Sequence, residues 1–218
     1  ALAGSFSVKF LPVVLIPLLW RRIPLRHGLL ATGLVLLLYV PFSGESFIPP
    51  IGSLGVYVEQ WRFNGPLFRL LSPLVGTFGA LALATAGGFG VAVMASRRLD
   101  LESPDAWSWP MATTLLLLPA IYPWYLLWLT PFLASRAAWP LIAWTVISPL
   151  TYVVWTSELA GNGWVLPLWV EPVEYGLVAA VGMWTFCTSS MSYTSSVWYF
   201  MGCFGSIRSR IFRIPRIC

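Results

Sequence analysis

Long apolar runs, one after another along almost the whole chain, constrain its fold more than any other feature of the sequence. They cover approximately residues 1–20, 28–42, 70–95, 110–121, 124–135, 139–157 and 175–203. An α-helix needs ~20 apolar residues to cross the hydrocarbon core of a bilayer. Only 10% of the 218 residues are charged, against roughly 25% in a soluble domain. The sequence therefore predicts an all-α, polytopic transmembrane helical bundle of about seven spans, and it excludes a soluble enzyme or a nucleic-acid-binding protein.

Arginine placement decides how the stretch around Tyr122-Pro123-Trp124 is divided. The stretch from Met111 to Ala134 could form one long helix or two half-length passes that turn at Pro123. With a turn there, ten of the thirteen basic residues fall on one side of the membrane and five of the eight acids fall on the other. Cytoplasmic loops carry such an excess of Lys and Arg. We therefore expect a hairpin at Pro123, with the acidic side extracytoplasmic, in a multi-pass protein.

Prolines are frequent inside the apolar runs, where each removes a backbone donor and bends or interrupts its helix. They are Pro12, Pro17, Pro119, Pro123, Pro131 and Pro149. Such breaks are tolerated in a membrane where neighbouring helices or a water-filled cavity satisfy the freed carbonyls. The sequence thus predicts kinked and half-length helices around a cavity.

The chain divides by composition into a bundle over residues 1–183 and a last segment over 184–218. The last segment is rich in serine and arginine, and either a final span with a basic cytoplasmic tail or a frameshift explains it. Arg21 and Arg22 follow the first apolar run, whereas the charges of a secretory signal precede it, so we expect an N-terminal truncation. With only His27 and no Cys-x-x-Cys pair, we expect no metal site and no cofactor.

Lys9 lies in the middle of the first apolar run. A cation there costs about 2.5–3.5 kcal/mol on insertion scales unless it pairs, snorkels or faces water. Lys9 is therefore a candidate functional residue, although a helix that begins further along the chain would leave it at the membrane interface.

Two further groups of candidates lie on the acidic side. Glu59, Arg62 and Arg69 fall in and after the outer loop, where arginines can hold a lipid phosphate, or the loop can serve as a plain interfacial anchor. Tyr122, Trp124 and Tyr125 surround the expected hairpin turn, where they can form a sugar-binding rim or an ordinary aromatic belt. The remaining acids, Glu158, Glu171 and Glu174, we expect to be solvated loop residues rather than catalytic bases.

Three segments together resemble a known family. They are Lys9-Phe10-Leu11-Pro12 followed by Pro17 and an Arg pair, the loop Glu59-Gln60-Trp61-Arg62-Phe63-Asn64, and Pro123-Trp124-Tyr125 with Trp128 and Pro131. Over roughly residues 1–180 the chain is similar to the C-terminal half of bacterial membrane-embedded C-class glycosyltransferases of the polyprenyl-phosphate-mannose-dependent type. That family often has His before Pro-Trp-Tyr, where this chain has Tyr122.

The resemblance implies a hexosyltransferase of the bacterial plasma membrane. It would transfer a hexose, mannose above all, with inversion from a polyprenyl-phosphate donor to a lipid or glycan acceptor at the extracytoplasmic face. In that family a carboxylate in the first outer loop is the base, and we expect this base upstream of residue 1. Two other interpretations of the sequence stay open: a transporter or lipid flippase without catalysis, whose broken helices and Lys9 would line a translocation route, and a structural membrane subunit.

Overall fold

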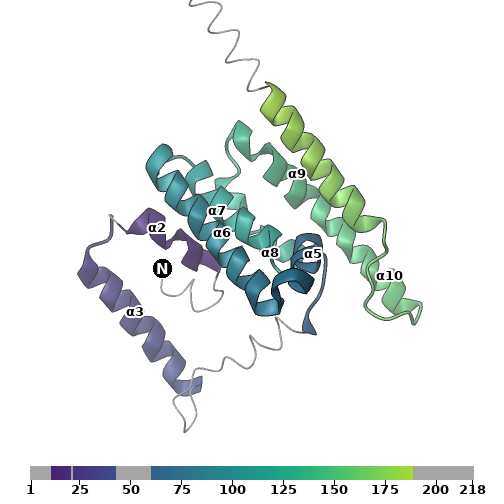
Figure 1. The fold of residues 1–218 in the computed structure, drawn as a ribbon, viewed down its shortest axis with the longest axis horizontal. Coiled ribbons are helices and arrows are strands. Elements are labelled where there is room, and N and C mark those ends of the chain that lie inside the picture. Colours follow the sequence, from purple (N-terminus) through teal and green to yellow (C-terminus); the bar gives the residue numbers. More distant parts are fainter. Residues whose placement is uncertain (1–10, 21, 43–59, 189–218) are drawn as a thin grey trace, which may run out of the picture.

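The computed structural model describes residues 11–20, 22–42 and 60–188. These residues form helices, and no β-strand occurs among them (Figure 1). The elements are η1 (Leu11–Leu15), α2 (Ile16–Leu19), α3 (Leu25–Tyr39), η2 (Val40–Phe42), α5 (Pro66–Val75), α6 (Thr77–Arg98), α7 (Asp105–Leu116), α8 (Pro123–Leu126), η3 (Thr130–Phe132), η4 (Arg136–Ala138), α9 (Trp139–Ile147), η5 (Ser148–Val153) and α10 (Val154–Leu159). A last helix covers residues 170–188. The prediction of an all-α fold is confirmed.

Two helical stretches in the described part of the chain are long and apolar enough to cross a membrane. They are α6 and the continuous stretch Arg136–Leu159, and α3 and α5 contain shorter apolar segments. The predicted number of about seven spans is therefore not confirmed. Large apolar side chains are exposed along several helices, for example Leu29, Leu30 and Leu37 on α3 and Phe78 on α6. Exposed apolar surface of this kind marks a surface that contacts lipid or another protein.

The centre of the molecule is the packing of α6 on α7, with α5 turning back against α6 (Figure 1). Gly76 joins α5 to α6 at φ +77°, a left-handed conformation that glycine adopts without strain. Along α6, a small residue at every fourth position is buried, namely Ala80, Ala84, Gly88 and Ala92. Small side chains let two helix backbones approach closely. This spacing explains how α7 lies directly on α6.

The stretch after α7 is broken, as the prolines predict. α7 ends at Leu116, residues 117–122 are not helical, and α8 begins at Pro123. The stretch 111–134 is thus not one helix. The second half-length pass expected over 124–135 is also wrong as a continuous helix, because only the short turns α8 and η3 form there. Both begin with proline in their first turn, where its missing N–H costs no helical bond.

A second layer is formed by the stretch Arg136–Leu159 and the helix 170–188, which lie side by side (Figure 1). The rings of Trp139 and Trp184 meet at one end, with centroids 5.5 Å apart. Further along the two helices, Trp144 donates a hydrogen bond to Glu174 at 2.9 Å. The helix 170–188 passes residue 184 without interruption, and the rest of the predicted segment 184–218 lies outside the described residues.

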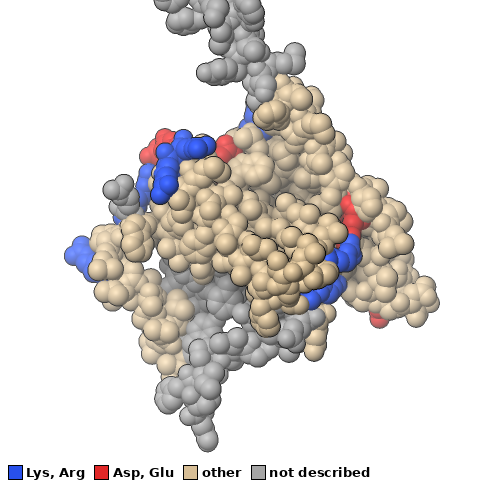
Figure 2. Space-filling view, viewed as in Figure 1, with Lys and Arg blue, Asp and Glu red and all other residues tan. Residues whose placement is uncertain are grey.

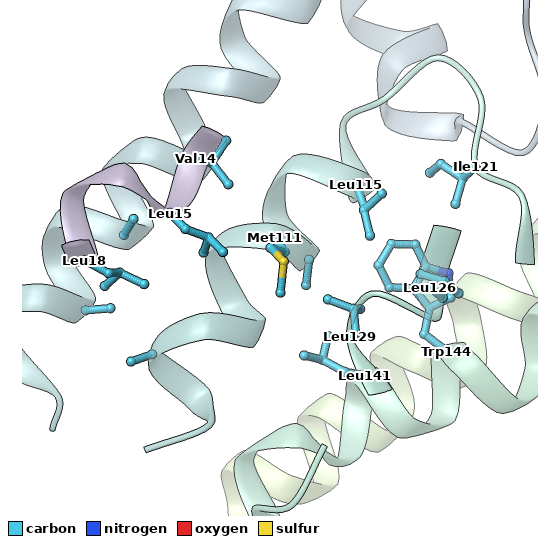
Figure 3. Close-up of a cluster of buried hydrophobic side chains, with 14 residues drawn as sticks. Val14, Leu15, Leu18, Met111, Leu115, Ile121, Leu126, Leu129, Leu141 and Trp144 are labelled. Carbon is cyan, nitrogen blue, oxygen red and sulfur yellow. The ribbon is translucent and has the colours of Figure 1, made fainter. Parts of the chain in front are cut away.

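One hydrophobic core joins these parts (Figure 3). Leu15 and Leu18 come from η1 and α2, Met111 and Leu115 from α7, and Trp144 from α9. Trp144 is among the largest fully buried side chains. Because a buried tryptophan dominates the packing around it, α9 is held against α7 and the broken stretch that follows it.

Candidate functional site

Two segments that are distant in the sequence meet at one place in the structure. Phe63 and Ala120 form an isolated parallel bridge. The Phe63 N–H donates to the Pro119 carbonyl at 3.1 Å, and the Ile121 N–H donates to the Phe63 carbonyl at 2.8 Å. The bridge satisfies backbone groups that the broken helix leaves without helical partners. It therefore fixes residues 61–65 against residues 117–122.

Gly65 is required for this approach. A Cβ at Gly65 would stand 2.6 Å from the Leu118 carbonyl oxygen and 2.8 Å from that of Pro119. Both are backbone atoms, which cannot rotate away as a flexible side chain can. The Asn64-Gly65-Pro66 turn thus brings the two segments together because position 65 has no side chain.

Five aromatic residues gather over this bridge. We call them the aromatic platform: Trp61, Phe63, Tyr122, Trp124 and Tyr125. The Tyr122 ring is stacked on Phe63 at a centroid distance of 4.6 Å and on Trp124 at 4.5 Å. Trp61 and Tyr125 meet Tyr122 edge-on, at 6.3 Å and 5.6 Å. Stacked and edge-on rings are the preferred geometries of aromatic pairs, so Tyr122 is the centre of the aromatic platform.

The aromatic surface continues beyond the platform. Trp124 approaches Tyr152 of η5 at 6.5 Å, and Phe63 approaches Trp164 at 6.2 Å. Trp164 in turn meets Trp155 of α10 edge-on at 4.8 Å. The tryptophans at positions 61, 124, 155 and 164 are all exposed. This part of the molecule therefore presents flat apolar rings to its surroundings.

The Tyr122 phenol keeps its proton at neutral pH. Burial raises the pKa of Tyr122, and the neighbouring Tyr125 phenol raises it further. A tyrosine that stays protonated is a hydrogen-bond donor and not a general base. With tyrosine at position 122, the proton chemistry of a histidine is not available there.

The arginines expected to bind phosphate follow the first platform residue in the chain, Arg62 directly after Trp61 and Arg69 on α5, and each has a contact of its own. The Arg62 guanidinium lies 4.8 Å from the centroid of the Phe68 ring. Arg69, on α5, forms an ion pair with Glu171 of the last helix. Figure 2 shows basic and acidic atoms side by side near α5. Lys9 and Glu59, the other two predicted candidates, lie outside the described residues.

A buried polar cluster lies behind the platform. Glu174 is 0% exposed and accepts two hydrogen bonds, from Trp144 Nε1 at 2.9 Å and from Asn64 Nδ2 at 3.0 Å. The next residue, Tyr175, donates its hydroxyl to the Asn64 carbonyl at 2.7 Å. Burial raises the pKa of the Glu174 carboxyl to about 7; the hydrogen bonds from Asn64 and Trp144 lower it, and the Glu171 charge raises it.

The expectation that Glu174 is a solvated loop acid is therefore wrong. Glu158 is exposed as expected, and Glu171 is occupied by Arg69. Sequence reasoning missed Glu174, Trp144 and Tyr175 as a group. One local signal could have indicated Glu174: it directly precedes a long apolar run. A residue at that place falls in the first turns of a helix, where it can pack against neighbouring helices.

No family model, curated protein or solved structure matches the chain. The function of the site is therefore inferred from its geometry and chemistry.

Proposed function

We propose that this chain is the membrane-embedded part of a bacterial glycosyltransferase. It would bind a polyprenyl-phosphate-linked hexose, mannose above all, at the extracytoplasmic face of a multi-pass bundle and pass the sugar to a lipid or glycan acceptor. The observation that carries the proposal is the aromatic platform, in which Tyr122 is stacked between Phe63 and Trp124, with Arg62 directly before Phe63 in the chain.

Exposed rings suit the sugar part of such a donor. One face of a hexose ring carries C–H groups, which pack on an aromatic face while the hydroxyls remain free for hydrogen bonds. Trp124 is 44% exposed although its ring is already stacked on Tyr122. The Tyr122 hydroxyl supplies a donor beside that ring, and binding sites for small molecules combine aromatic walls with a few polar groups in this way.

Arginines suit the phosphate part. Arg62 and Arg69 project from the segment that begins at the platform and continues into α5. A guanidinium binds phosphate oxygens through two parallel hydrogen bonds. Arg69 now holds the Glu171 carboxylate, so a donor phosphate would compete with that carboxylate for the same guanidinium.

The transfer step needs charge stabilisation at the leaving phosphate. The acceptor oxygen attacks the anomeric carbon, the bond from that carbon to the phosphate oxygen breaks, and a carboxylate base takes the acceptor proton. The negative charge on the leaving polyprenyl phosphate then grows, and nearby cations lower the barrier. In this chain we assign that part to Arg62 and Arg69, and hydrogen bonding to the sugar to Tyr122.

Donor binding tests the proposal. The chain in nanodiscs is titrated with radiolabelled polyprenyl-phosphate mannose, and Trp124→Ala is compared with Trp139→Ala. Trp139 is a matched control because it is 47% exposed and also contacts another aromatic ring. Trp139 lies at the start of α9, whereas Trp124 packs near Tyr152 in the same helical stretch. At 1.5 Å per residue, Tyr152 is about 20 Å from Trp139 along that stretch. We expect affinity to fall about three- to tenfold for Trp124→Ala alone. An equal loss in both variants, or no saturable binding, would contradict the proposal.

The broken stretch 117–138 favours a second candidate, a lipid flippase. Interrupted helices recur in proteins that carry polar groups through a bilayer. In this stretch α8, η3 and η4 follow one another, and each is only about one turn long. A flippase would move a fluorescent polyprenyl-phosphate sugar across a vesicle membrane without forming a new glycosidic bond. Measuring both outcomes in one vesicle preparation separates the two functions.

A further inference from the structure

The buried polar cluster behind the aromatic platform has no part in the proposed sugar transfer. We propose that Glu174 is the positioning residue of the aromatic platform: its buried carboxyl holds the Asn64 turn, and the backbone bridge at Phe63 transmits that position to Tyr122. The part of this inference that concerns donor binding rests on the proposed function, whereas the mechanical part does not.

The Asn64 turn needs to be held. Asn64 has φ +53° and is the one non-glycine residue in the described part of the chain with a positive φ. Asparagine tolerates this left-handed conformation better than most residues, but it remains a minority state. In this turn both ends of the residue are bound, because the side chain donates to Glu174 and the backbone carbonyl accepts from Tyr175. Two consecutive residues of the last helix therefore fix one turn.

The turn is connected to the platform by a short covalent and hydrogen-bonded path. Phe63, which precedes Asn64, makes both hydrogen bonds of the bridge to residues 119–121. The Phe63 ring is stacked on Tyr122 with planes 14° apart. A rotation of the Asn64 peptide would therefore break the bridge and tilt the Phe63 ring away from Tyr122.

Glu174 also has the features of a proton-sensitive residue. The groups that face it are Asn64 from the turn, Trp144 from α9, and Tyr175 and Glu171 from its own helix; the Arg69 cation of α5 is occupied by Glu171. Its two hydrogen-bond donors are neutral, and the nearest charge acting on it is a like charge. Burial then favours the protonated form. The hydrogen bonds from Asn64 and Trp144 favour the carboxylate, but burial is the larger effect and favours the neutral acid. Because water relieves the cost of the buried charge only when the site opens, we expect opening of the turn to become easier as pH rises toward about 7.

Glutamine at position 174 separates positioning from charge. The buried Asn64 Oδ1 has no hydrogen-bond partner. After a flip of the Asn64 amide, Oδ1 would accept from the glutamine Nε2, while the glutamine Oε1 would keep the bond from Trp144. Glu174→Gln should therefore hold the turn at every pH, whereas Glu174→Ala should not hold it at any.

The first measurement is hydrogen–deuterium exchange of the full chain in nanodiscs, on peptides covering 61–65 and 117–122, corrected for the intrinsic effect of pH. Between about pH 5.5 and about pH 8.5 we expect wild-type protection to fall roughly tenfold. Glu174→Gln should stay protected throughout, and Glu174→Ala should be unprotected throughout. Glu158→Gln removes an exposed carboxyl and should follow the wild-type profile. A pH-dependent Glu174→Gln profile, or full protection in Glu174→Ala, would overturn the proposal.

If Glu174→Ala does not fold, Asn64→Gly replaces it, because glycine accepts the positive φ and removes only the side-chain bond to Glu174. At low pH, Asn64→Gly should be about as weakly protected as the wild type is at high pH. Protection equal to that of the wild type at low pH would count against the proposal. The second measurement is affinity for polyprenyl-phosphate mannose over the same pH range. Affinity should fall with protection in wild type and stay constant in Glu174→Gln. If affinity does not change with pH as the exchange profile does, the positioning role of Glu174 is overturned. If no binding occurs but the exchange profile is as expected, only the proposed function is overturned.

Discussion

Gly88 of α6 faces Thr114 of α7 so closely that no side chain fits between them. A Cβ at Gly88 would overlap the Thr114 hydroxyl oxygen and lie 3.0 Å from the Pro110 carbonyl oxygen. Thr114 is itself buried and donates its hydroxyl to that carbonyl. The contact between the two central helices thus depends on this glycine.

Gly88→Ala should destabilise the protein by about 1–3 kcal/mol, the usual cost of overpacking a core. The neighbouring Gly87→Ala is the control, because its Cβ would meet only Leu117 Cδ1 and Thr113 Cγ2, at 3.5 Å and 3.6 Å. Gly87→Ala should be neutral or stabilising by up to about 1 kcal/mol, since alanine is the better helix former. Thermal unfolding in one detergent compares them, and equal melting temperatures would contradict the expected packing.

Gly65→Ala should disrupt the bridge beneath the aromatic platform. The new methyl group would press on the carbonyls of Leu118 and Pro119. We therefore expect the hydrogen bonds of Phe63 to Pro119 and to Ile121 to break, and donor affinity to fall more than about tenfold under the proposed function. Gly90→Ala in α6 is the control, because nothing lies within 4 Å of its Cβ position. Exchange of the 61–65 peptide and donor binding measure the two effects; a protected 61–65 peptide in Gly65→Ala would contradict this geometry.

The stability of the protein should fall as pH rises from about 4.5 to about 7. The folded pKa of Glu174 lies above its ordinary value of 4.5, so the folded state binds the proton more tightly and gains stability at low pH. That gain is complete below about pH 4.5 and lost above about pH 7, with a size on the order of 3 kcal/mol. Denaturant unfolding across this range should show the slope in wild type and lose most of it in Glu174→Gln. An identical slope in both proteins would mean that other groups cause it.

Local features of the fold could be predicted from the sequence. The prolines predict the break at Pro123, because a missing N–H is a property of a single position. Tyr122, Trp124 and Tyr125 are neighbours in the chain, so their grouping follows from the turn itself. Short turns replace the expected pass over 124–135 because two prolines, Pro123 and Pro131, lie within ten residues. The apolar composition of the run alone favoured a continuous helix.

Contacts between distant segments could not be predicted in the same way. The bridge from Phe63 to Ala120, and the bond from Asn64 to Glu174, join residues whose neighbourhood depends on how α5, α6 and α7 turn back on one another. Periodicity shows which face of a helix is apolar but not which partner covers it. A glutamate before an apolar run therefore looked solvated, although the last helix buries it against α9 and the Asn64 turn.

Glu171→Gln should separate the stability of the protein from its affinity for phosphate. The ion pair of Arg69 with Glu171 is open to solvent on the Arg69 side, which is 66% exposed, whereas Glu171 is 15% exposed. Such pairs contribute about 0–1 kcal/mol, so unfolding should change little. Under the proposed function, removal of the competing carboxylate leaves the Arg69 guanidinium to the donor phosphate, and affinity for polyprenyl-phosphate mannose should rise severalfold, more at low than at high ionic strength. Arg69→Gln should lower the same affinity. A loss of affinity in Glu171→Gln would mean that the Glu171 carboxylate itself contacts the donor, and that Arg69 serves to orient this carboxylate rather than to bind the phosphate.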